Sequence, residues 1–248
     1  MFDNAFSVKT SFYKIQKLFY DGGTEIKMIF KNYERIVFAG DSVTDVGSAN
    51  PVGDGFSESL GNGYVRIIEN LLSAVYPDVF VRVTNSGISG NSTRHLKDRF
   101  DRDVINLNPD YISICIGIND VWRQFDVPTI PSATVYPDEY ERNLTEMVEK
   151  SVKVAKKVFI MSPYFINTNK EDTLRKFMEP YIEICKNLSE KYGCEFINLQ
   201  ELFDNYCKFR HPTFIARDGI HPNPIGATLI AYEFLKHCDF DPHHIPSL

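Results

Sequence analysis

The sequence predicts an α/β protein: a three-layer α/β/α sandwich around a central, mainly parallel sheet of about five strands. Two observations lead to this prediction. From residue 35 onward, short apolar runs alternate with longer segments in which apolar residues recur at helical spacing. This alternation implies right-handed crossovers, which cover a parallel sheet with helices on both faces. No internal repeat or low-complexity linker interrupts the pattern, so we expect one domain over residues 34–248.

Five short segments have the length and composition of strands. The first is an apolar run that ends at Gly40, and we expect it to be buried on both faces of the sheet. The third lies between Pro109 and Gly117. The predicted strands span residues 35–39, 79–83, 111–116, 158–161 and 195–199.

The segments between these strands carry apolar residues three or four positions apart, which predicts amphipathic helices. Ser92 or Thr93 can cap the second helix, and Pro180 predicts a kink or an early break in the fourth. The last helix begins with Asn223 as its N-cap and Pro224 in its first position. The helix faces are defined by Tyr64, Ile68, Leu71 and Val75; Leu96, Phe100, Val104 and Leu107; Tyr140, Leu144, Met147 and Ser151; and Leu174, Met178, Tyr181, Cys185 and Leu188.

Composition argues against several classes of protein. The chain has 27 Lys and Arg against 33 Asp and Glu, a formal net charge of −6, and it lacks the basic block that nucleic-acid binding requires. Its five cysteines form no CxxC pair, so neither a metal site nor a disulfide framework is indicated, and we expect a cytoplasmic protein. No apolar run is long enough to span a membrane, so no membrane partner is expected.

Residues 1–33 are expected to form an N-terminal extension. They lack the basic start, continuous apolar centre and cleavage site of a signal peptide. Two interpretations stay open: Met28 is the natural start of the protein, or residues 11–19 form an amphipathic helix that packs on the domain or on a neighbouring subunit. The aromatic residues of this segment are a candidate surface for a homo-oligomer.

Ligands of open α/β sheets bind beyond the carboxyl ends of the strands, so polar residues at those ends are candidate site residues. Gly40-Asp41-Ser42 follows the first strand. The glycine allows a sharp turn that presents the serine hydroxyl at the rim of the sheet, as a nucleophile requires. Taken alone, Asp and Ser are equally common as turn formers and helix caps.

The next two strands are followed by candidate hydrogen-bond donors. Residues 85–91 contain Gly87 and Gly90, which permit close backbone approach to a ligand and expose N–H groups. Asn119 follows the third strand, and its amide can donate to an oxyanion. The alternative interpretations are a glycine-rich turn and an Asx-turn.

Asp218 and His221 stand three residues apart in the loop before the last helix. An imidazole that takes a serine proton and a carboxylate that orients the imidazole complete a catalytic triad. The other five histidines lie on a helix, at the end of the chain or in a loop without a matching carboxylate. Together the strand ends and this loop supply a nucleophile, two oxyanion donors, a base and an orienting group, the set that acyl transfer needs.

These motifs, Gly40-Asp41-Ser42, Gly87, Gly117-Ile118-Asn119-Asp120 and Asp218-Gly219-Ile220-His221, resemble the four sequence blocks of SGNH (GDSL-type) hydrolases, which have a flavodoxin-like α/β fold. The resemblance covers the chain from about residue 36 to about residue 235. It implies that Ser42 is the nucleophile and that Asp218 and His221 complete the triad. It also implies an oxyanion hole formed by the backbone N–H groups of Ser42 and Gly87 and the side chain of Asn119.

Residues 40–45, 60–65, 87–91 and 117–124 look like the intracellular acetylxylan esterases of bacteria, which deacetylate xylo-oligosaccharides and need no metal or other cofactor. This resemblance implies a serine esterase with a small acetylated carbohydrate as its substrate. In the implied mechanism His221 takes the proton of Ser42, which attacks the acetyl carbonyl, and water then hydrolyses the acetyl-serine intermediate.

Asp41, Trp122 and Arg123 are further candidates for binding substrate. The indole of Trp122 suits stacking on a sugar ring, although packing of its loop is an equal alternative. Arg123 either pairs with an acidic neighbour or faces the substrate, and Asp41 either stabilises the nucleophile turn or contacts substrate. Two rival functions remain: a thioesterase or lipid esterase with the same triad, and a non-catalytic α/β binding module. The first turn lacks the glycine-rich phosphate fingerprint and the lysine that a phosphate-binding module uses.

Overall fold

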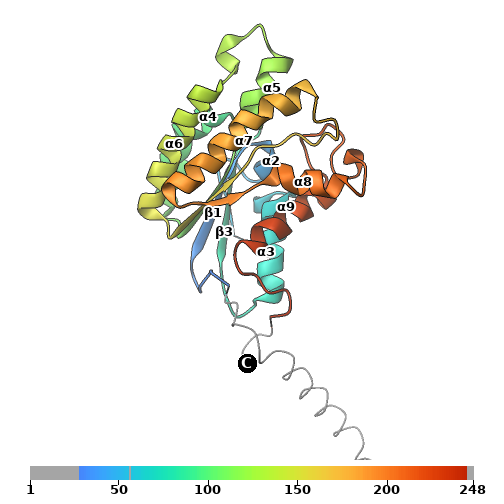
Figure 1. Cartoon of the computed structure of the whole chain (residues 1–248). Coiled ribbons are helices and arrows are strands. Elements are labelled where there is room, and N and C mark those ends of the chain that lie inside the picture. The colour runs from blue at the N-terminus through green and yellow to red at the C-terminus, as the bar shows by residue number, and fades with distance from the viewer. Residues whose placement is uncertain (1–27, 56, 245–248) are drawn as a thin grey trace, which may run out of the picture.

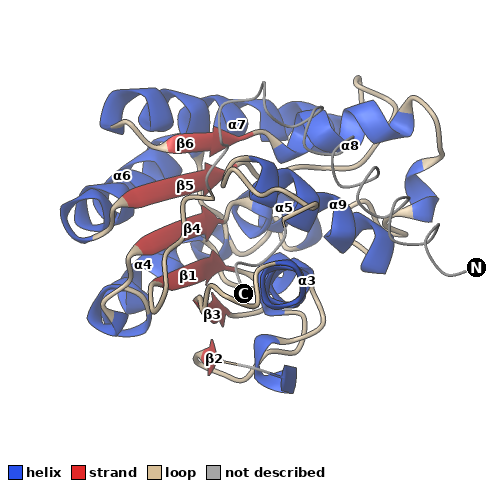
Figure 2. Cartoon of the chain, turned by 90° about the horizontal axis from the view of Figure 1, so that it is seen from below, coloured by secondary structure: helices blue, strands red, loops and turns tan. Residues whose placement is uncertain are grey.

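The computed structural model describes residues 28–55 and 57–244. Their strands form one sheet in the order β2-β3-β1-β4-β5-β6, which Figure 2 shows edge on among the helices. The short β2 (Gly53–Asp54) pairs antiparallel with β3 at the sheet edge. The other five strands run parallel: β1 (Arg35–Gly40), β3 (Arg82–Gly87), β4 (Tyr111–Cys115), β5 (Lys157–Met161) and β6 (Glu195–Ile197). The predicted three-layer sandwich with a mainly parallel sheet is confirmed.

The register of the central strands brings three strand ends together. Gly40, the last residue of β1, lies opposite Gly87 at the end of β3 and Cys115 at the end of β4. Because parallel strands share one carboxyl edge, the loops after these three residues start side by side at that edge. The position of any site that these loops form is therefore set by the strand register.

Helices cover both faces of the sheet, as the alternating pattern predicts (Figure 1). Consecutive residues of β1 point to opposite faces, so Val37 and Phe38 belong to different apolar cores. The Phe38 core packs against α3 (Tyr64–Val75), α8 (Leu199–Cys207) and α9 (Pro224–Lys236). The Val37 core packs against α4 (Thr93–Asp103), α5 (Ile118–Asp126), α6 (Pro137–Val154) and α7 (Thr173–Tyr192).

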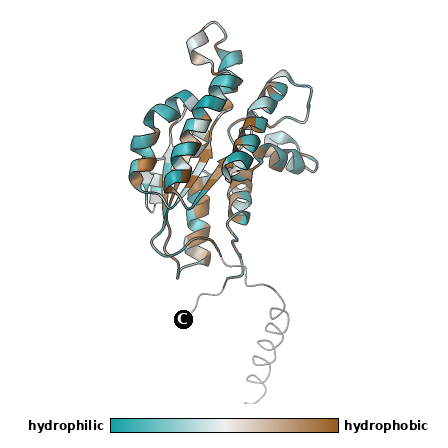
Figure 3. Cartoon of the chain, turned by 60° about the vertical axis from the view of Figure 1, so that its left-hand side comes forward, coloured by the Kyte–Doolittle hydropathy of each residue, from teal (hydrophilic) through white to brown (hydrophobic). Residues whose placement is uncertain are grey.

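Short elements complete the described chain. The one-turn helix α2 (Ser42–Asp45) follows β1 directly. Four short 3₁₀ helices lie at Ser57–Leu60, Ile105–Leu107, Pro131–Ala133 and Pro212–Phe214. Figure 3 shows the strands of the sheet mostly in the hydrophobic colour and the outer helices mostly in the hydrophilic one. Within the described ranges, no helix combines the length and the hydropathy that crossing a membrane would require.

Three elements differ from the sequence prediction. The strand predicted at residues 79–83 is β3 (Arg82–Gly87), because Thr84, Asn85 and Ser86 are polar but buried in the sheet and so interrupt no strand. The helix predicted to include Leu107 stops at Asp103 and is followed by a 3₁₀ turn. The third difference is Pro180, which neither breaks nor shortens α7. This proline is on the exposed side of the helix, where water can satisfy the carbonyl that has lost its N–H partner.

The segment just before β1 packs on the domain. Met28 and Phe30 are buried in the same core as Phe38, and the N–H of Ile29 donates to the carbonyl of Cys238. The packed domain thus includes residues before the boundary expected at residue 34. The two interpretations of the preceding extension concern residues 1–27, which lie outside the described residues.

Candidate active site

The turn after β1 presents Ser42 at the carboxyl edge of the sheet. A side chain on Gly40 would put its Cβ 2.2 Å from the hydroxyl oxygen of Thr44, so only glycine fits this turn. Asp41 is the N-cap of α2, and its carboxylate accepts a hydrogen bond of 3.0 Å from the N–H of Val43. Ser42 is the first residue of α2, and its N–H has no acceptor within that helix.

Asp41 stabilises this turn from a buried position. Its side chain is buried, with 1% of the residue exposed, and it does not line the pocket described below. Burial raises the pKa of the Asp41 carboxyl to about 7, against the hydrogen bond from Val43, which lowers it. The structure thus places Asp41 away from the pocket, and the contact that it shows is the hydrogen bond within the nucleophile turn.

The loop before α9 holds Asp218 and His221 in one hydrogen-bonded turn. One carboxylate oxygen of Asp218 accepts the N–H groups of Ile220 at 2.9 Å and His221 at 2.8 Å. The other lies 2.7 Å from Nδ1 of the His221 ring. Gly219 has a φ of 76° and packs so closely on Phe165 that a Cβ would come within 2.7 Å of its ring, so the turn needs glycine here.

The same contacts set the charge of Asp218. Burial alone would raise the pKa of this carboxyl, but the hydrogen bonds from the His221 ring and from two backbone N–H groups outweigh it and lower the pKa. Because an ionised carboxylate can only accept, Nδ1 of His221 carries the ring proton and Nε2 is left as an acceptor.

The structure joins this turn to Ser42, 179 residues away in the chain. Nε2 of His221 lies 2.9 Å from the hydroxyl oxygen of Ser42, so the hydroxyl donates to the ring nitrogen that is free to accept. The three predicted triad residues therefore form one continuous chain of hydrogen bonds, from hydroxyl to imidazole to carboxylate.

A pocket of about 460 Å³ opens beside this chain of hydrogen bonds. Asn119 lies in the first turn of α5 and lines the pocket. One N–H of its amide donates to the carbonyl of Asn91 at 3.0 Å, and the second N–H of the amide remains for a ligand. The residues that line the pocket are Ser42, Val46, Ser89, Gly90, Asn119, Trp122, Arg123, His221 and Pro222.

The structure places Gly87, a predicted oxyanion donor, away from the pocket. Its N–H donates to the side-chain oxygen of Asn85 at 2.9 Å, and a Cβ at this position would lie 2.4 Å from the backbone nitrogen of Asp45. Gly87 is thus packed inside the sheet edge and does not line the pocket. Gly90, three residues later, lines it instead, and within the described residues its N–H makes no hydrogen bond.

Gly90 was missed because the sequence gives two glycines in one turn and nothing that distinguishes them. The structure does distinguish them: Gly90 has a φ of 82° and open space where a side chain would lie. Asp45 holds this turn, accepting the N–H of Ser89 at 3.0 Å and its hydroxyl at 2.6 Å.

Trp122 and Arg123 both line the pocket, on the side of α5. The Trp122 ring lies 6.1 Å from the His221 ring, edge to face, and the Arg123 guanidinium lies 5.4 Å from the centre of the indole. Arg123 also pairs with Asp126, which is the acidic neighbour expected as its alternative partner. The indole is therefore close to both the His221 ring and the Arg123 guanidinium.

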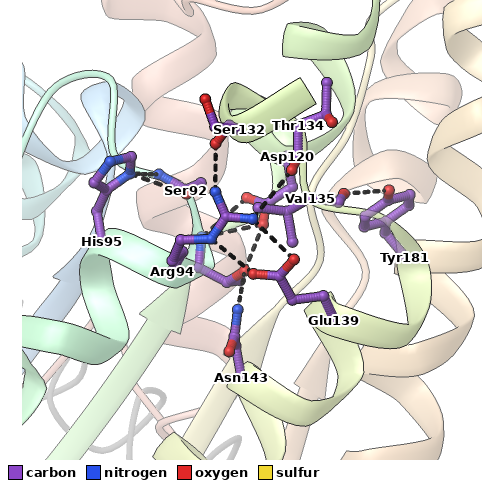
Figure 4. A network of polar contacts seen from close by, with 11 residues as sticks. Ser92, Arg94, His95, Asp120, Ser132, Thr134, Val135, Glu139, Asn143 and Tyr181 are labelled. Carbon is purple, nitrogen blue, oxygen red and sulfur yellow. Dashed lines mark hydrogen bonds and ion pairs between the residues drawn. The ribbon is translucent and has the colours of Figure 1, made fainter. Parts of the chain in front are cut away.

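A polar network that includes Asp120, the residue after Asn119, links α4, α5 and α6 (Figure 4). Asp120 accepts the N–H of Thr93 at 3.1 Å and so caps α4, which lies 27 residues earlier in the chain. Burial raises the pKa of the Asp120 carboxyl to about 7, although the Thr93 hydrogen bonds act to lower it. Arg94 joins Glu139 of α6 at 2.8 Å and the carbonyl of Thr134 at 3.2 Å. The network binds α4, α5 and α6 to the loop before α6.

Known proteins share this fold and much of this sequence. Residues 38–229 match the GDSL-like Lipase/Acylhydrolase family. An acetylxylan esterase of Geobacillus stearothermophilus is 41% identical over 208 residues, which are 84% of this chain and 95% of that protein. An arylesterase of Vibrio mimicus is 25% identical over 190 residues, which are 73% of this chain and 86% of that protein.

Solved structures agree with these sequence matches. The acetylxylan esterase Axe2 of Geobacillus stearothermophilus has a TM-score of 0.84 and 40% identity, and the match covers 87% of this chain and 98% of that chain. LAE5, an α/β hydrolase enzyme from the metagenome of Lake Arreo, has a TM-score of 0.83 and 38% identity over 87% of this chain and 100% of its own.

Three structures of Axe2 are of catalytic mutants, in which a serine, an aspartate or a histidine is replaced by alanine. That aspartate and that histidine are three positions apart, as Asp218 and His221 are here. The family match over most of the chain and the 41% identity to a relative agree with the arrangement of the site. This chain belongs to the GDSL-like lipase/acylhydrolase family.

Proposed function

We propose that the protein is a serine esterase that removes acetyl groups from small acetylated carbohydrates, xylo-oligosaccharides above all, through an acetyl-serine intermediate on Ser42. The observation that supports this most is the continuous contact from the Ser42 hydroxyl through His221 to Asp218, at 2.9 and 2.7 Å, beside an open pocket. Homology to an acetylxylan esterase over most of the chain supports the ester-hydrolysing chemistry.

In the first half of the reaction Nε2 of His221 takes the proton of Ser42 while the serine oxygen bonds to the acetyl carbonyl carbon. The ionised Asp218 stabilises the imidazolium that results and keeps the ring oriented toward the serine. The imidazolium then gives its proton to the departing sugar oxygen, which leaves as an alcohol. A water molecule activated by the same imidazole hydrolyses the acetyl-serine and restores the free hydroxyl.

Three donors are available for the negative oxygen of the tetrahedral intermediate: the backbone N–H groups of Ser42 and Gly90 and the side-chain amide of Asn119. Each belongs to a residue that lines the pocket. Such donors are already in place before the negative charge develops on the oxygen. They stabilise the intermediate well because the protein does not have to reorganise during the reaction. We assign the second backbone donor to Gly90 in place of Gly87.

The pocket favours a sugar over a long acyl chain. Its wall includes a tryptophan and an arginine at the rim, and an indole face stacks well on a sugar ring. A preference for acetate over octanoate among p-nitrophenyl esters is expected on this basis. A lipid esterase or thioesterase with the same triad would show the opposite preference.

The deciding experiment measures acetate release from a panel of acetylated sugars, with acetylated xylo-oligosaccharides, acetylated glucose and acetylated glucosamine as members. Wild type is expected to release acetate fastest from the xylo-oligosaccharides, and Ser42→Ala is expected to release none above background. Equal acetate release by wild type and Ser42→Ala would overturn the esterase assignment. Faster release by wild type from another acetylated sugar would overturn the assignment of xylo-oligosaccharides as the substrate.

Two expectations from the sequence stay predictions. We propose that the protein works in the reducing cytoplasm, since its five cysteines are all free. Self-association through the N-terminal segment would be tested by comparing the mass of the full chain and of residues 28–248 in solution by light scattering. A full chain that is monomeric at assay concentration would contradict it.

A further inference from the structure

Arg99 is a buried arginine on α4 that does not line the pocket beside Ser42 and takes no part in the chemistry described above. Its side chain is 7% exposed. A guanidinium presents five N–H donors in a rigid plane, and it keeps its charge when buried. Burying such a group is unfavourable unless its donors are paired, so the partners of Arg99 indicate what the residue is for.

The guanidinium bonds to the ends of two strands and to the loop that follows the second. One terminal nitrogen, Nη2, donates to the carbonyl of Gly40 at 3.0 Å and to the carbonyl of Ser86 at 2.9 Å. The other, Nη1, donates to the Ser86 hydroxyl at 3.0 Å and lies 3.5 Å from Asp103. Nε donates to the side-chain oxygen of Asn91 at 2.8 Å.

Two of these partners, Gly40 and Asn91, lie close to a proposed oxyanion donor. Gly40 ends β1 and lies two residues before Ser42. Asn91 directly follows Gly90, and its carbonyl accepts the amide of Asn119 at 3.0 Å. One side chain therefore joins the end of β1, which leads to Ser42, to the loop that carries Gly90 and accepts the Asn119 amide, although it touches none of the donors itself.

From these contacts we propose that Arg99 is a positioning residue of the oxyanion hole, which sets the spacing of the Ser42 and Gly90 N–H groups and the Asn119 amide. This inference rests on the function proposed above. Oxyanion donors work within a narrow range of distances, and a displacement of about 1 Å can reduce a rate about 10²-fold.

Lysine at this position tests the geometry without removing the charge. An ammonium has three donors on one atom and cannot span acceptors as far apart as Gly40, Ser86 and Asn91. Arg99→Lys is therefore expected to lower kcat for p-nitrophenyl acetate about 10²-fold and to change KM much less.

The matched control is Arg175→Lys. Arg175 lies on α7, its side chain is also 7% exposed, and it also pairs with a carboxylate, Asp204, at 2.7 Å. Among the described residues, its polar partners are Asp172 and Asp204, neither of which lines the pocket. Both variants are expected to lose a similar amount of thermal stability, but Arg175→Lys should keep the wild-type kcat. A comparable loss of kcat in both variants would show that Arg99 acts only through stability and would overturn the inference.

A second measurement reports on the oxyanion hole directly. Phenylboronic acid adds to a serine hydroxyl, and its tetrahedral adduct holds a negatively charged oxygen where the oxyanion would lie. Its inhibition constant is expected to rise in Arg99→Lys by about the factor by which kcat falls. An unchanged inhibition constant together with a reduced kcat would place the defect outside the oxyanion hole and overturn the inference.

If Arg99→Lys fails to fold, Asn91→Ala is the variant to test. Asn91 is partly exposed, and its replacement removes only the hydrogen bond from Nε of Arg99 to the Asn91 side chain. It is expected to lower kcat about tenfold with a matching rise of the boronate inhibition constant. A wild-type kcat together with a wild-type boronate inhibition constant in Asn91→Ala would overturn the inference. These results are distinct from a failure of the proposed function, in which wild type itself would hydrolyse esters no faster than Ser42→Ala.

Discussion

Replacing Asp218 by asparagine changes the charge of the orienting residue and almost nothing else. The oxygen of the new side chain can still accept the backbone N–H groups of Ile220 and His221, which lie at 2.9 and 2.8 Å in the wild type. Its amide nitrogen then takes the place of the oxygen that lies 2.7 Å from Nδ1 of His221. The turn therefore keeps two of its three contacts.

The third contact is reversed, and this is what should stop catalysis. An amide nitrogen donates, so Nδ1 must accept and the ring proton moves to Nε2, which faces the Ser42 hydroxyl at 2.9 Å. In that tautomer the imidazole cannot take the serine proton. In a Ser-His-Asp triad this change costs about 10⁴-fold in kcat, or about 5.4 kcal/mol at 1.36 kcal/mol for each factor of ten.

The assay is the initial rate of p-nitrophenyl acetate hydrolysis between pH 5 and 9, with the melting temperature of each protein followed by circular dichroism. Because the turn keeps its backbone contacts, the melting temperature is expected to change by no more than about 3 °C. Asp54→Asn is the control, since this carboxylate is also hydrogen-bonded but lies on β2, outside the pocket. Wild-type kcat in Asp218→Asn, with the fold intact, would refute the reasoning.

Further expectations concern other parts of the chain. Asn119→Ala should lower kcat by roughly 10²–10³-fold with a smaller change in KM, and steady-state kinetics with no loss would remove Asn119 from the site. Trp122→Ala should raise KM for acetylated xylo-oligosaccharide while leaving KM for p-nitrophenyl acetate unchanged. If wild type and Trp122→Ala have the same KM for the sugar, the indole only packs its loop. Phe38→Ala removes a fully buried ring that packs 5.0 Å from Phe234, so urea unfolding should show a loss of about 3–5 kcal/mol, and a loss below about 1 kcal/mol would contradict the packing. The pKa of Asp218 is lowered in the folded state, so its ionised form stabilises the fold at neutral pH and this contribution is lost as the pH falls through the folded pKa. The difference in melting temperature between wild type and Asp218→Asn should therefore shrink toward acid pH, and a difference that stays constant would contradict it.

The fold could be predicted from the sequence because buried parallel strands leave a clear apolar signal. Residues 111–116 are almost all apolar, and β4 lies within them. Searching for apolar runs did not locate the end of β3, because its residues Thr84 to Ser86 are polar yet buried. Their polar groups find partners only in the folded protein, such as Arg99 for Ser86 and the carbonyls of Thr44 and Leu60 for Asn85.

The contact of Ser42 with His221 and Asp218 could be predicted because each functional role restricts the residue type and its place, at a strand end or in the loop before the last helix. The second backbone donor proposed for the oxyanion hole, Gly90, could not be predicted. Nearly every residue has a backbone N–H, and the sequence does not show where that N–H points. The two glycines differ only in the folded protein, where the N–H of Gly87 donates to Asn85 and Gly90 lines the pocket. Arg99 left no signal either, since a basic residue on a polar helix is expected to face solvent.

The central claim is that Ser42 is a nucleophile activated by His221 and oriented through Asp218. Labelling with a fluorophosphonate tests it most directly, because the reagent forms a covalent bond to an activated serine with loss of fluoride. We expect one label per chain, located on Ser42 by peptide mass spectrometry, and much slower labelling in His221→Ala. Label on another residue, or an unchanged rate in His221→Ala, would contradict the account.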